Sequence, residues 1–111
     1  MSKFVVIYTS PESVESAVES LTPEEEAAST QAWMDWAART GEKLADFGAP
    51  LGHGKHVAQS GVTDAPVGVG GYSFVEAVDL DEAVAMMDGH PHLLTPGGTI
   101  QVYEVLAVPG M

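Results

Sequence analysis

Residues 3–9 form an apolar run of β-branched and aromatic side chains that predicts a β-strand, and the run stops at Ser10-Pro11, a turn signal. Both faces of this strand are apolar, with Phe4, Val6 and Tyr8 on one side and Val5 and Ile7 on the other. A strand covered on one side alone should alternate with polar residues. We therefore expect each of its faces to be covered.

A long helix is predicted over residues 23–43, after a polar stretch that reads as a loop with at most one helical turn. Thr22 as N-cap, Pro23 at the first helical position and Glu25 three residues after the cap form a capping box. An apolar stripe that should lie on the sheet recurs at helical spacing at Trp33, Trp36, Ala37 and Leu44. We interpret the two tryptophans as core or interface anchors.

The middle of the chain is less regular. Residues 44–51 and 55–59 indicate a second strand region, interrupted at Gly52-His53-Gly54, and residues 61–70 are expected to be a loop. The clearest third strand covers residues 72–78, with Tyr72, Phe74 and Glu76 on one face.

A second helix and a last strand follow. Asp79 as N-cap, with Glu82 at the third helical position, predicts a short helix that ends near Asp88 and Gly89, where glycine suits a left-handed cap. The last strand is predicted over residues 99–108 and is closed by Pro109.

The predicted elements follow the ferredoxin-like order βαββαβ. This order is typical of an α+β fold with both helices on one face of an antiparallel sheet. The helix-free face would carry Val5 and Ile7, and Tyr72, Phe74 and Tyr103 can project together on it. Such an apolar patch on a monomer marks an interaction surface. We therefore expect a homodimer that packs two sheets face to face.

Composition narrows the possible partners. The 111 residues suit a single domain, residues 1–111, and the formal charge of -12 repels phosphate backbones and anionic lipid headgroups. We expect no nucleic acid and no membrane as partners. The sequence has no cysteine, which excludes thiol chemistry, and neither a signal-peptide layout nor a membrane-length apolar run, so we expect a cytoplasmic protein.

Four short motifs in the second half of the chain resemble the YCII-related family of the dimeric α+β barrel superfamily. They are Gly71-Tyr72-Ser73-Phe74-Val75-Glu76-Ala77, Leu80-Asp81-Glu82-Ala83, Asp88-Gly89-His90-Pro91-His92-Leu93 and Gly98-Thr99-Ile100-Gln101-Val102. The resemblance implies the fold and a dimer whose sheets enclose a cleft.

Some members of that family resemble lyases that act on small, often aromatic compounds through a His and Asp pair, with the histidine on the first helix. The helix predicted here has no histidine, and Thr30, Gln31 and Asp35 occupy the corresponding region. Whether the chain is an enzyme therefore stays open. If it is one, we expect a lyase-like acid–base catalyst.

His90 and His92 flank Pro91, and a residue before proline is pushed into an extended conformation. Residues two apart in extended chain project to one side, so both imidazoles could face one site as general acid or base. The alternative is a polar helix end, where a histidine binds the last carbonyl groups. We take His92 as a candidate catalytic residue and His90 as a ligand-binding one.

Glu76 is the second candidate catalytic residue, because its strand parity matches that of Tyr72. Gln101 and Tyr103 alternate onto one face of the last strand, which makes Tyr72, Gln101 and Tyr103 candidate ligand-binding residues. A carboxylate desolvated in an apolar cleft would have a raised pKa and could move a proton. The alternative is a rim position open to water; Asp46 is a weaker candidate.

Two other motifs carry no site. His53 and His56 have a His-x-x-His spacing, but no carboxylate or cysteine motif completes a ligand set. The glycines at positions 68, 70 and 71 precede a strand rather than a helix, which is the wrong context for a phosphate loop. We expect no metal and no cofactor.

Two functions remain. The first is a small-molecule binder or enzyme that uses a cleft at the dimer interface. The second is a non-catalytic, dimeric accessory or interaction module in which the histidines have no chemical role.

Overall fold

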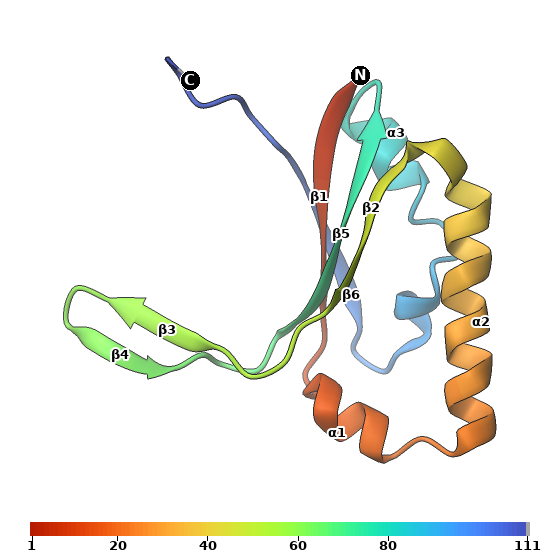
Figure 1. Ribbon diagram of the computed structural model, residues 1–111, viewed down its shortest axis with the longest axis vertical. Helices are drawn as coiled ribbons and strands as arrows, with labels where there is room; N and C mark the ends of the chain where they lie inside the picture. The colour runs from red at the N-terminus through yellow and green to blue at the C-terminus, as the bar shows by residue number, and fades with distance from the viewer. Residues whose placement is uncertain (111) are drawn as a thin grey trace.

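A four-stranded antiparallel sheet in the order β2-β5-β1-β6 forms the centre of the computed structural model, which describes residues 1–110 apart from the side chain of Glu15 (Figure 1). Its strands are β1 (Ser2–Thr9), β2 (Leu44–Pro50), β5 (Val69–Ala77) and β6 (Thr99–Glu104). The predicted α+β class with an antiparallel sheet is confirmed.

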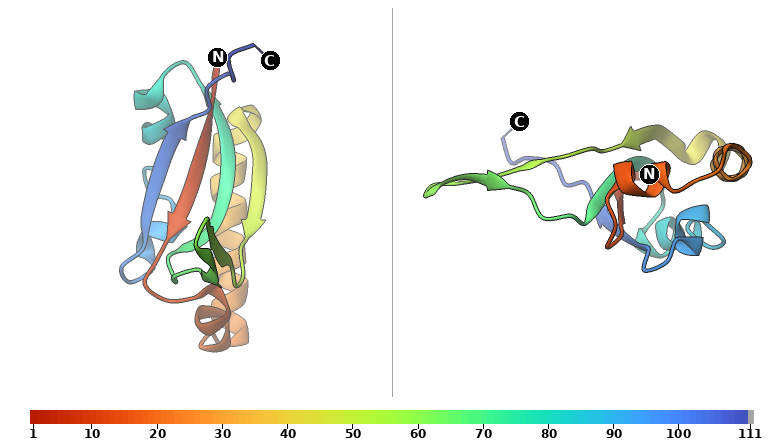
Figure 2. Two further views of the ribbon diagram at one scale, coloured as in Figure 1. Left: turned by 90° about the vertical axis from the view of Figure 1, so that its left-hand side faces the viewer. Right: turned by 90° about the horizontal axis from the view of Figure 1, so that it is seen from below.

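Helices α2 (Pro23–Thr40) and α3 (Leu80–Ala85) lie on one side of this sheet (Figures 1 and 2). Both predicted caps are present. Thr22 and Glu25 exchange two hydrogen bonds of 3.1 Å, and Asp79 Oδ1 accepts from the Glu82 N–H at 2.9 Å. The described residues form three further helical elements, α1 (Val14–Glu19) and the 3₁₀ turns η1 (Gly41–Lys43) and η2 (Pro91–Leu94). No described helix is both long and apolar enough to cross a bilayer.

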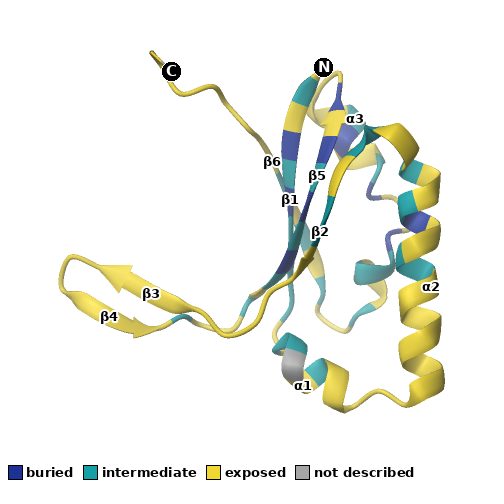
Figure 3. Ribbon diagram, viewed as in Figure 1, coloured by how far each residue is buried: buried dark blue, intermediate teal, exposed yellow. Residues whose placement is uncertain are grey.

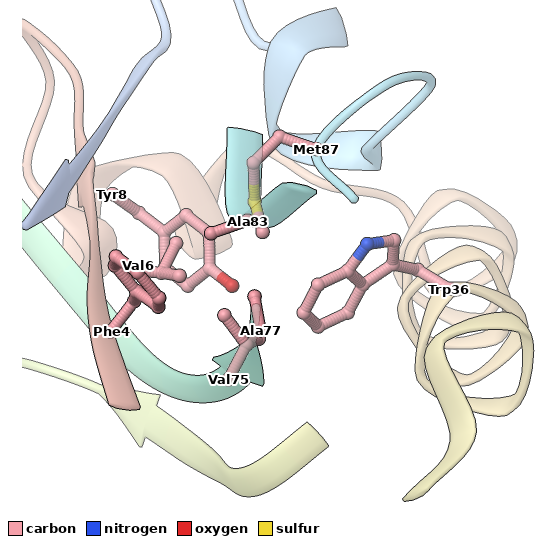
Figure 4. Packing of buried hydrophobic residues seen from close by; sticks show 8 residues of the cluster. All are labelled: Phe4, Val6, Tyr8, Trp36, Val75, Ala77, Ala83 and Met87. Carbon is pink, nitrogen blue, oxygen red and sulfur yellow. The ribbon is translucent and has the colours of Figure 1, made fainter. Parts of the chain in front are cut away.

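The core lies between the sheet and these helices (Figures 3 and 4). Its buried apolar residues are Phe4, Val6, Tyr8, Trp36, Val75, Ala77, Ala83 and Met87. Trp36 is 2% exposed, and its Nε1 donates to the Met86 carbonyl oxygen at 2.9 Å, which ties α2 to the end of α3. The face of β1 that carries Phe4, Val6 and Tyr8 therefore supplies a large part of the core.

The prediction of a loop over residues 61–70 is wrong. A second, two-stranded sheet pairs β3 (Lys55–Ala58) with β4 (Gly61–Asp64), and β5 already begins at Val69. This hairpin projects away from the helices (Figure 1), and every residue of its two strands is exposed. Strand β3 lies within the strand region predicted at residues 55–59, whereas β4, with neither face buried, lacks the apolar alternation from which strands are recognised.

Two predicted boundaries and one residue assignment also need correction. Helix α2 ends at Thr40, because Gly41 takes a φ of 65°, and Leu44 belongs to β2 rather than to the helical stripe. The last strand ends at Glu104, not at Val108. Its partner β1 begins at Ser2, and after the bond from the Val105 N–H to the Lys3 carbonyl oxygen β1 offers no further pairing.

Candidate functional site

The side of the sheet that faces away from α2 and α3 carries a connected set of aromatic and polar side chains. We call this set the bare face, and its members are Lys3, Val5, Ile7, Tyr72, Phe74, Glu76, Gln101 and Tyr103. The register of three strands brings them together: Val5 lies between Phe74 and Tyr103, Ile7 lies between Tyr72 and Gln101, and Lys3 is opposite Glu76.

Aromatic contacts organise the bare face. The Tyr72 and Phe74 rings meet edge to face at 5.9 Å, and Lys3 Nζ lies 4.8 Å from the centre of the Phe74 ring. Tyr103 Oη donates to Gln101 Oε1 at 3.3 Å, although the Tyr103 side chain is 55% exposed. In a single chain this arrangement is an open surface, and Glu76 is exposed on it. The desolvation expected around Glu76 would therefore have to come from another molecule.

The two histidines lie among residues of the helix-covered side. His90 is 1% exposed, with its ring 4.3 Å from Trp36, 4.6 Å from Trp33 and 5.0 Å from Tyr8 between ring centres. Burial, reinforced by the nearby His92 and Arg39, lowers the pKa of His90 to about 4. At neutral pH the His90 ring is therefore uncharged.

Hydrogen bonds assign the protons of both rings. His90 Nδ1 accepts from the His92 N–H at 3.0 Å, so the neutral ring of His90 carries its proton on Nε2, a buried atom with no hydrogen-bond partner. His92 Nε2 lies 2.8 Å from the Thr9 carbonyl oxygen, which can only accept, so this nitrogen is the donor. Both imidazoles thus hold the backbone around them.

The expectation of an extended segment from His90 to His92 is only partly right. His90 is extended, as proline requires of its predecessor, but Pro91 begins the 3₁₀ turn η2, which contains His92. The structure brings His90 and His92 together, and separately brings together Glu76, Tyr72, Gln101 and Tyr103. It does not bring His92 to Glu76, because the sheet lies between them.

A buried polar chain crosses the helix-covered side. Ser73 Oγ lies 2.6 Å from the Phe47 carbonyl oxygen, to which it donates, so Tyr8 Oη donates to Ser73 Oγ at 2.8 Å. Burial raises the pKa of Tyr8 to about 12. Sequence reasoning missed this chain. The signal was available, since Ser73 has the parity of the buried residues of β5 and needs a partner there.

The remaining candidates have local roles. Asp46 Oδ1 accepts from the Gly48 N–H at 2.8 Å at an irregular point of β2, and Gln31 Nε2 donates to Asp35 Oδ1 at 2.8 Å on the exposed side of α2. His53 and His56 are exposed. Among the described residues, no three histidine or acidic side chains come close enough to hold a metal ion.

No protein-family model and no curated protein matches the chain. The resemblance to YCII-related proteins therefore stays a prediction that rests on its motif residues. What the structure contributes independently is a bare face with three aromatic rings, an amide, a carboxylate and a lysine.

Proposed function

We propose that the chain is a homodimeric, ligand-binding domain of the YCII-related kind, in which two copies oppose their bare faces and enclose a small aromatic molecule. One observation carries the proposal: Tyr72, Phe74 and Tyr103 share one face of the sheet with Glu76. Aromatic rings on an exposed face, with a few placed polar groups, form the lining typical of a small-molecule site once the face is covered.

The shape of the single chain supports a second copy as that cover. Its radius of gyration is 15.5 Å, whereas a compact chain of this length has one of about 13 Å. The excess comes in part from the β3–β4 hairpin, which extends beyond the sheet (Figures 1 and 2). A lone two-stranded hairpin is marginally stable in water. A second copy would give both the hairpin and the bare face something to pack against.

Charge argues for apolar contact at the interface. Each copy carries a formal charge of -12, so two copies repel one another at long range. The bare face has one positive and one negative member, Lys3 and Glu76, and its other members are uncharged. Electrostatic repulsion between two copies therefore opposes association least at the bare face.

Measurement of the mass by analytical ultracentrifugation at micromolar concentration tests the dimer. We expect twice the mass of one chain. Phe74→Glu should give monomers with unchanged circular dichroism, since Phe74 packs on the bare face and not in the core. Met34→Glu is the matched control, because Met34 is 53% exposed on α2, and it should leave the dimer intact. A monomeric wild-type protein would overturn the proposal.

The charge of the cleft predicts the class of ligand. A carboxylate beside aromatic rings favours a planar cation, which gains a charge-assisted hydrogen bond and cation–π contacts. We expect benzamidine to bind about tenfold more tightly than benzoate, with benzamide between them. Chemical-shift titration of the wild-type protein measures the three affinities.

Two variants that each remove one negative charge show whether the preference for benzamidine depends on the Glu76 carboxylate or on the overall charge of the chain. Glu76→Gln should abolish the preference for benzamidine. Glu104→Gln should retain it, since Glu104 pairs with Phe4 and so has the opposite strand parity. Equal affinities of the wild-type protein for all three probes would contradict the ligand class.

A second candidate function is supported by the histidines. Both ring nitrogens that form hydrogen bonds, Nδ1 of His90 and Nε2 of His92, bind backbone groups of the chain itself. This use favours a non-catalytic interaction module over an acid–base enzyme. A stable dimer that binds none of the three probes would favour the module.

A further inference from the structure

An apolar groove opens beside the edge strand β6, on the helix side of the sheet. Its volume is about 550 Å³, and its walls come from three elements: Leu80, Val84 and Ala85 of α3, Leu93 of η2, and Ile100 and Val102 of β6. We call it the edge groove. It is distinct from the bare face, because Ile100 and Val102 have the parity of the core residues Tyr8 and Val6, with which they pair.

The edge groove exists because α3 is short. Helix α3 has six residues against eighteen in α2, so it covers β6 incompletely and leaves Ile100 and Val102 half-buried. Leu80, Val84 and Leu93 are each close to half exposed at its rim. The one charged residue of its lining is Asp88. The groove therefore suits an uncharged, apolar occupant.

Residues 105–110 have the matching chemistry. The sequence Val-Leu-Ala-Val-Pro-Gly contains no charged side chain, and three of its six residues are Val or Leu. Leu106 is 73% and Val108 58% exposed. After the bond from the Val105 N–H to Lys3, the segment leaves the sheet and runs away from α3, so it does not lie in the groove of its own chain (Figures 1 and 2).

We infer that the edge groove of each copy binds residues 105–110 of the other copy. This inference rests on the proposed dimer and adds a reciprocal exchange of segments to it. Strand β6 lies at the edge of the sheet, so its outer backbone groups are free to pair with an added strand. Six extended residues span about 20 Å, which matches the six residues of β6.

The exchange would cover both the edge groove and residues 105–110. A single chain leaves both an apolar groove and an apolar segment in water, and neither can cover the other within that chain as folded here. Exchange of identical elements between two copies covers both without a third partner. Pro109 cannot donate a backbone hydrogen bond, so it would end the added strand.

Disulfide trapping tests this contact directly, because the chain has no native cysteine. Leu106→Cys protein labelled with ¹⁵N is mixed with unlabelled Val84→Cys protein and oxidised. We expect a mixed disulfide, which mass spectrometry identifies from its one labelled and one unlabelled peptide. Unlabelled Met34→Cys protein is the control partner, because Met34 lies on α2 at similar exposure, and it should link poorly.

Three results would overturn the inference. The first is equal linkage of Leu106→Cys to Val84→Cys and to Met34→Cys. The second is a Leu106→Cys/Val84→Cys double variant that closes its disulfide within one chain and not between chains. The third is an unchanged dimer affinity in the full-length Leu106→Glu/Val108→Glu variant, in which loss of two buried apolar side chains should weaken dimerisation at least about tenfold.

Ultracentrifugation keeps the two proposals distinguishable. If the wild-type protein is a dimer and the mixed disulfide does not form, the exchange is wrong and the bare-face dimer stands. If the wild-type protein is a monomer, both are wrong. If Phe74→Glu is monomeric and Leu106→Glu/Val108→Glu dimerises more weakly than wild type, both are supported.

Discussion

His90 caps the turn that contains His92: its Nδ1 atom accepts a hydrogen bond from the His92 backbone N–H at 3.0 Å. Protonation of Nδ1 would remove this acceptor and place a positive charge in a buried site between Trp33 and Trp36. The folded chain therefore resists protonation of His90, which is the physical content of its lowered pKa.

Acid should destabilise the protein through His90. Its pKa is about 4 in the folded chain and about 6.5 in an unfolded chain. The unfolded state therefore binds more protons between these values, so the stability is fully present above pH 6.5 and is lost as the pH falls toward 4. The loss from this one group should reach about 3 kcal/mol near pH 4.

His90→Asn isolates this effect, because asparagine can accept the same capping bond and does not titrate. Urea unfolding of both proteins from pH 7 to pH 4 provides the measurement. The variant should be less stable at pH 7, since it loses packing, and its deficit should shrink as the pH falls. If the difference in unfolding free energy between the variant and the wild type stayed constant from pH 7 to pH 4, His90 would not resist protonation.

Alkali should act through Tyr8. Its pKa is about 12 in the folded chain and about 10 when unfolded, so the folded state holds this proton more tightly. The stability from this group is present below pH 10 and falls as the pH rises from 10 to 12, by up to about 3 kcal/mol. Tyr8→Phe should lack this decline, and should cost about 1 kcal/mol at pH 7 for the lost bond to Ser73. Parallel alkaline stability curves for the two proteins would contradict the assignment.

Trp36 should be the most costly side chain of α2 to truncate. It is buried against the sheet and also donates a hydrogen bond to Met86. Trp36→Ala should cost about 3 to 5 kcal/mol of unfolding free energy. Trp36→Phe retains most of the packing and should cost less than Trp36→Ala. An urea midpoint for Trp36→Ala within error of the wild type would exclude a core role.

Local chemistry made several parts of this structure predictable. The capping box at Thr22 and the N-cap at Asp79 depend on residues three positions apart, so the sequence displays them directly. The alternation of β5 likewise places Tyr72, Phe74 and Glu76 together before any partner strand is known. The α+β class and the composition of the bare face follow from such signals.

Contacts between residues far apart in the sequence could not be predicted from such local signals. Strand register places Lys3 opposite Glu76, and nothing near either residue specifies that pairing. The burial of His90 depends on Tyr8 and the α2 tryptophans, which lie far from it in the sequence. Strand β4 of the exposed hairpin had no buried face to reveal it. Sequence reasoning therefore predicted the extended backbone of His90 correctly but missed the 3₁₀ turn that contains His92.

Gly48 should be the least replaceable glycine of the sheet. It lies in the irregular part of β2, with a φ of 77°, a conformation that L side chains rarely adopt. A Cβ atom there would lie 1.8 Å from the Tyr72 carbonyl oxygen and 3.1 Å from the Tyr72 ring. Gly48→Ala must therefore separate β2 from β5 and displace Tyr72, a member of the bare face.

Gly41→Ala provides the matched control for this prediction. Gly41 has a similar φ of 65°, but a Cβ atom added to it meets nothing within 4 Å. Backbone strain alone should therefore cost Gly41→Ala about 1 to 2 kcal/mol. Gly48→Ala should lose that amount and a further contribution from the clash, about 3 kcal/mol or more in total. Equal urea midpoints for the two variants would mean that β2 and β5 do not approach one another as closely as the structure has them.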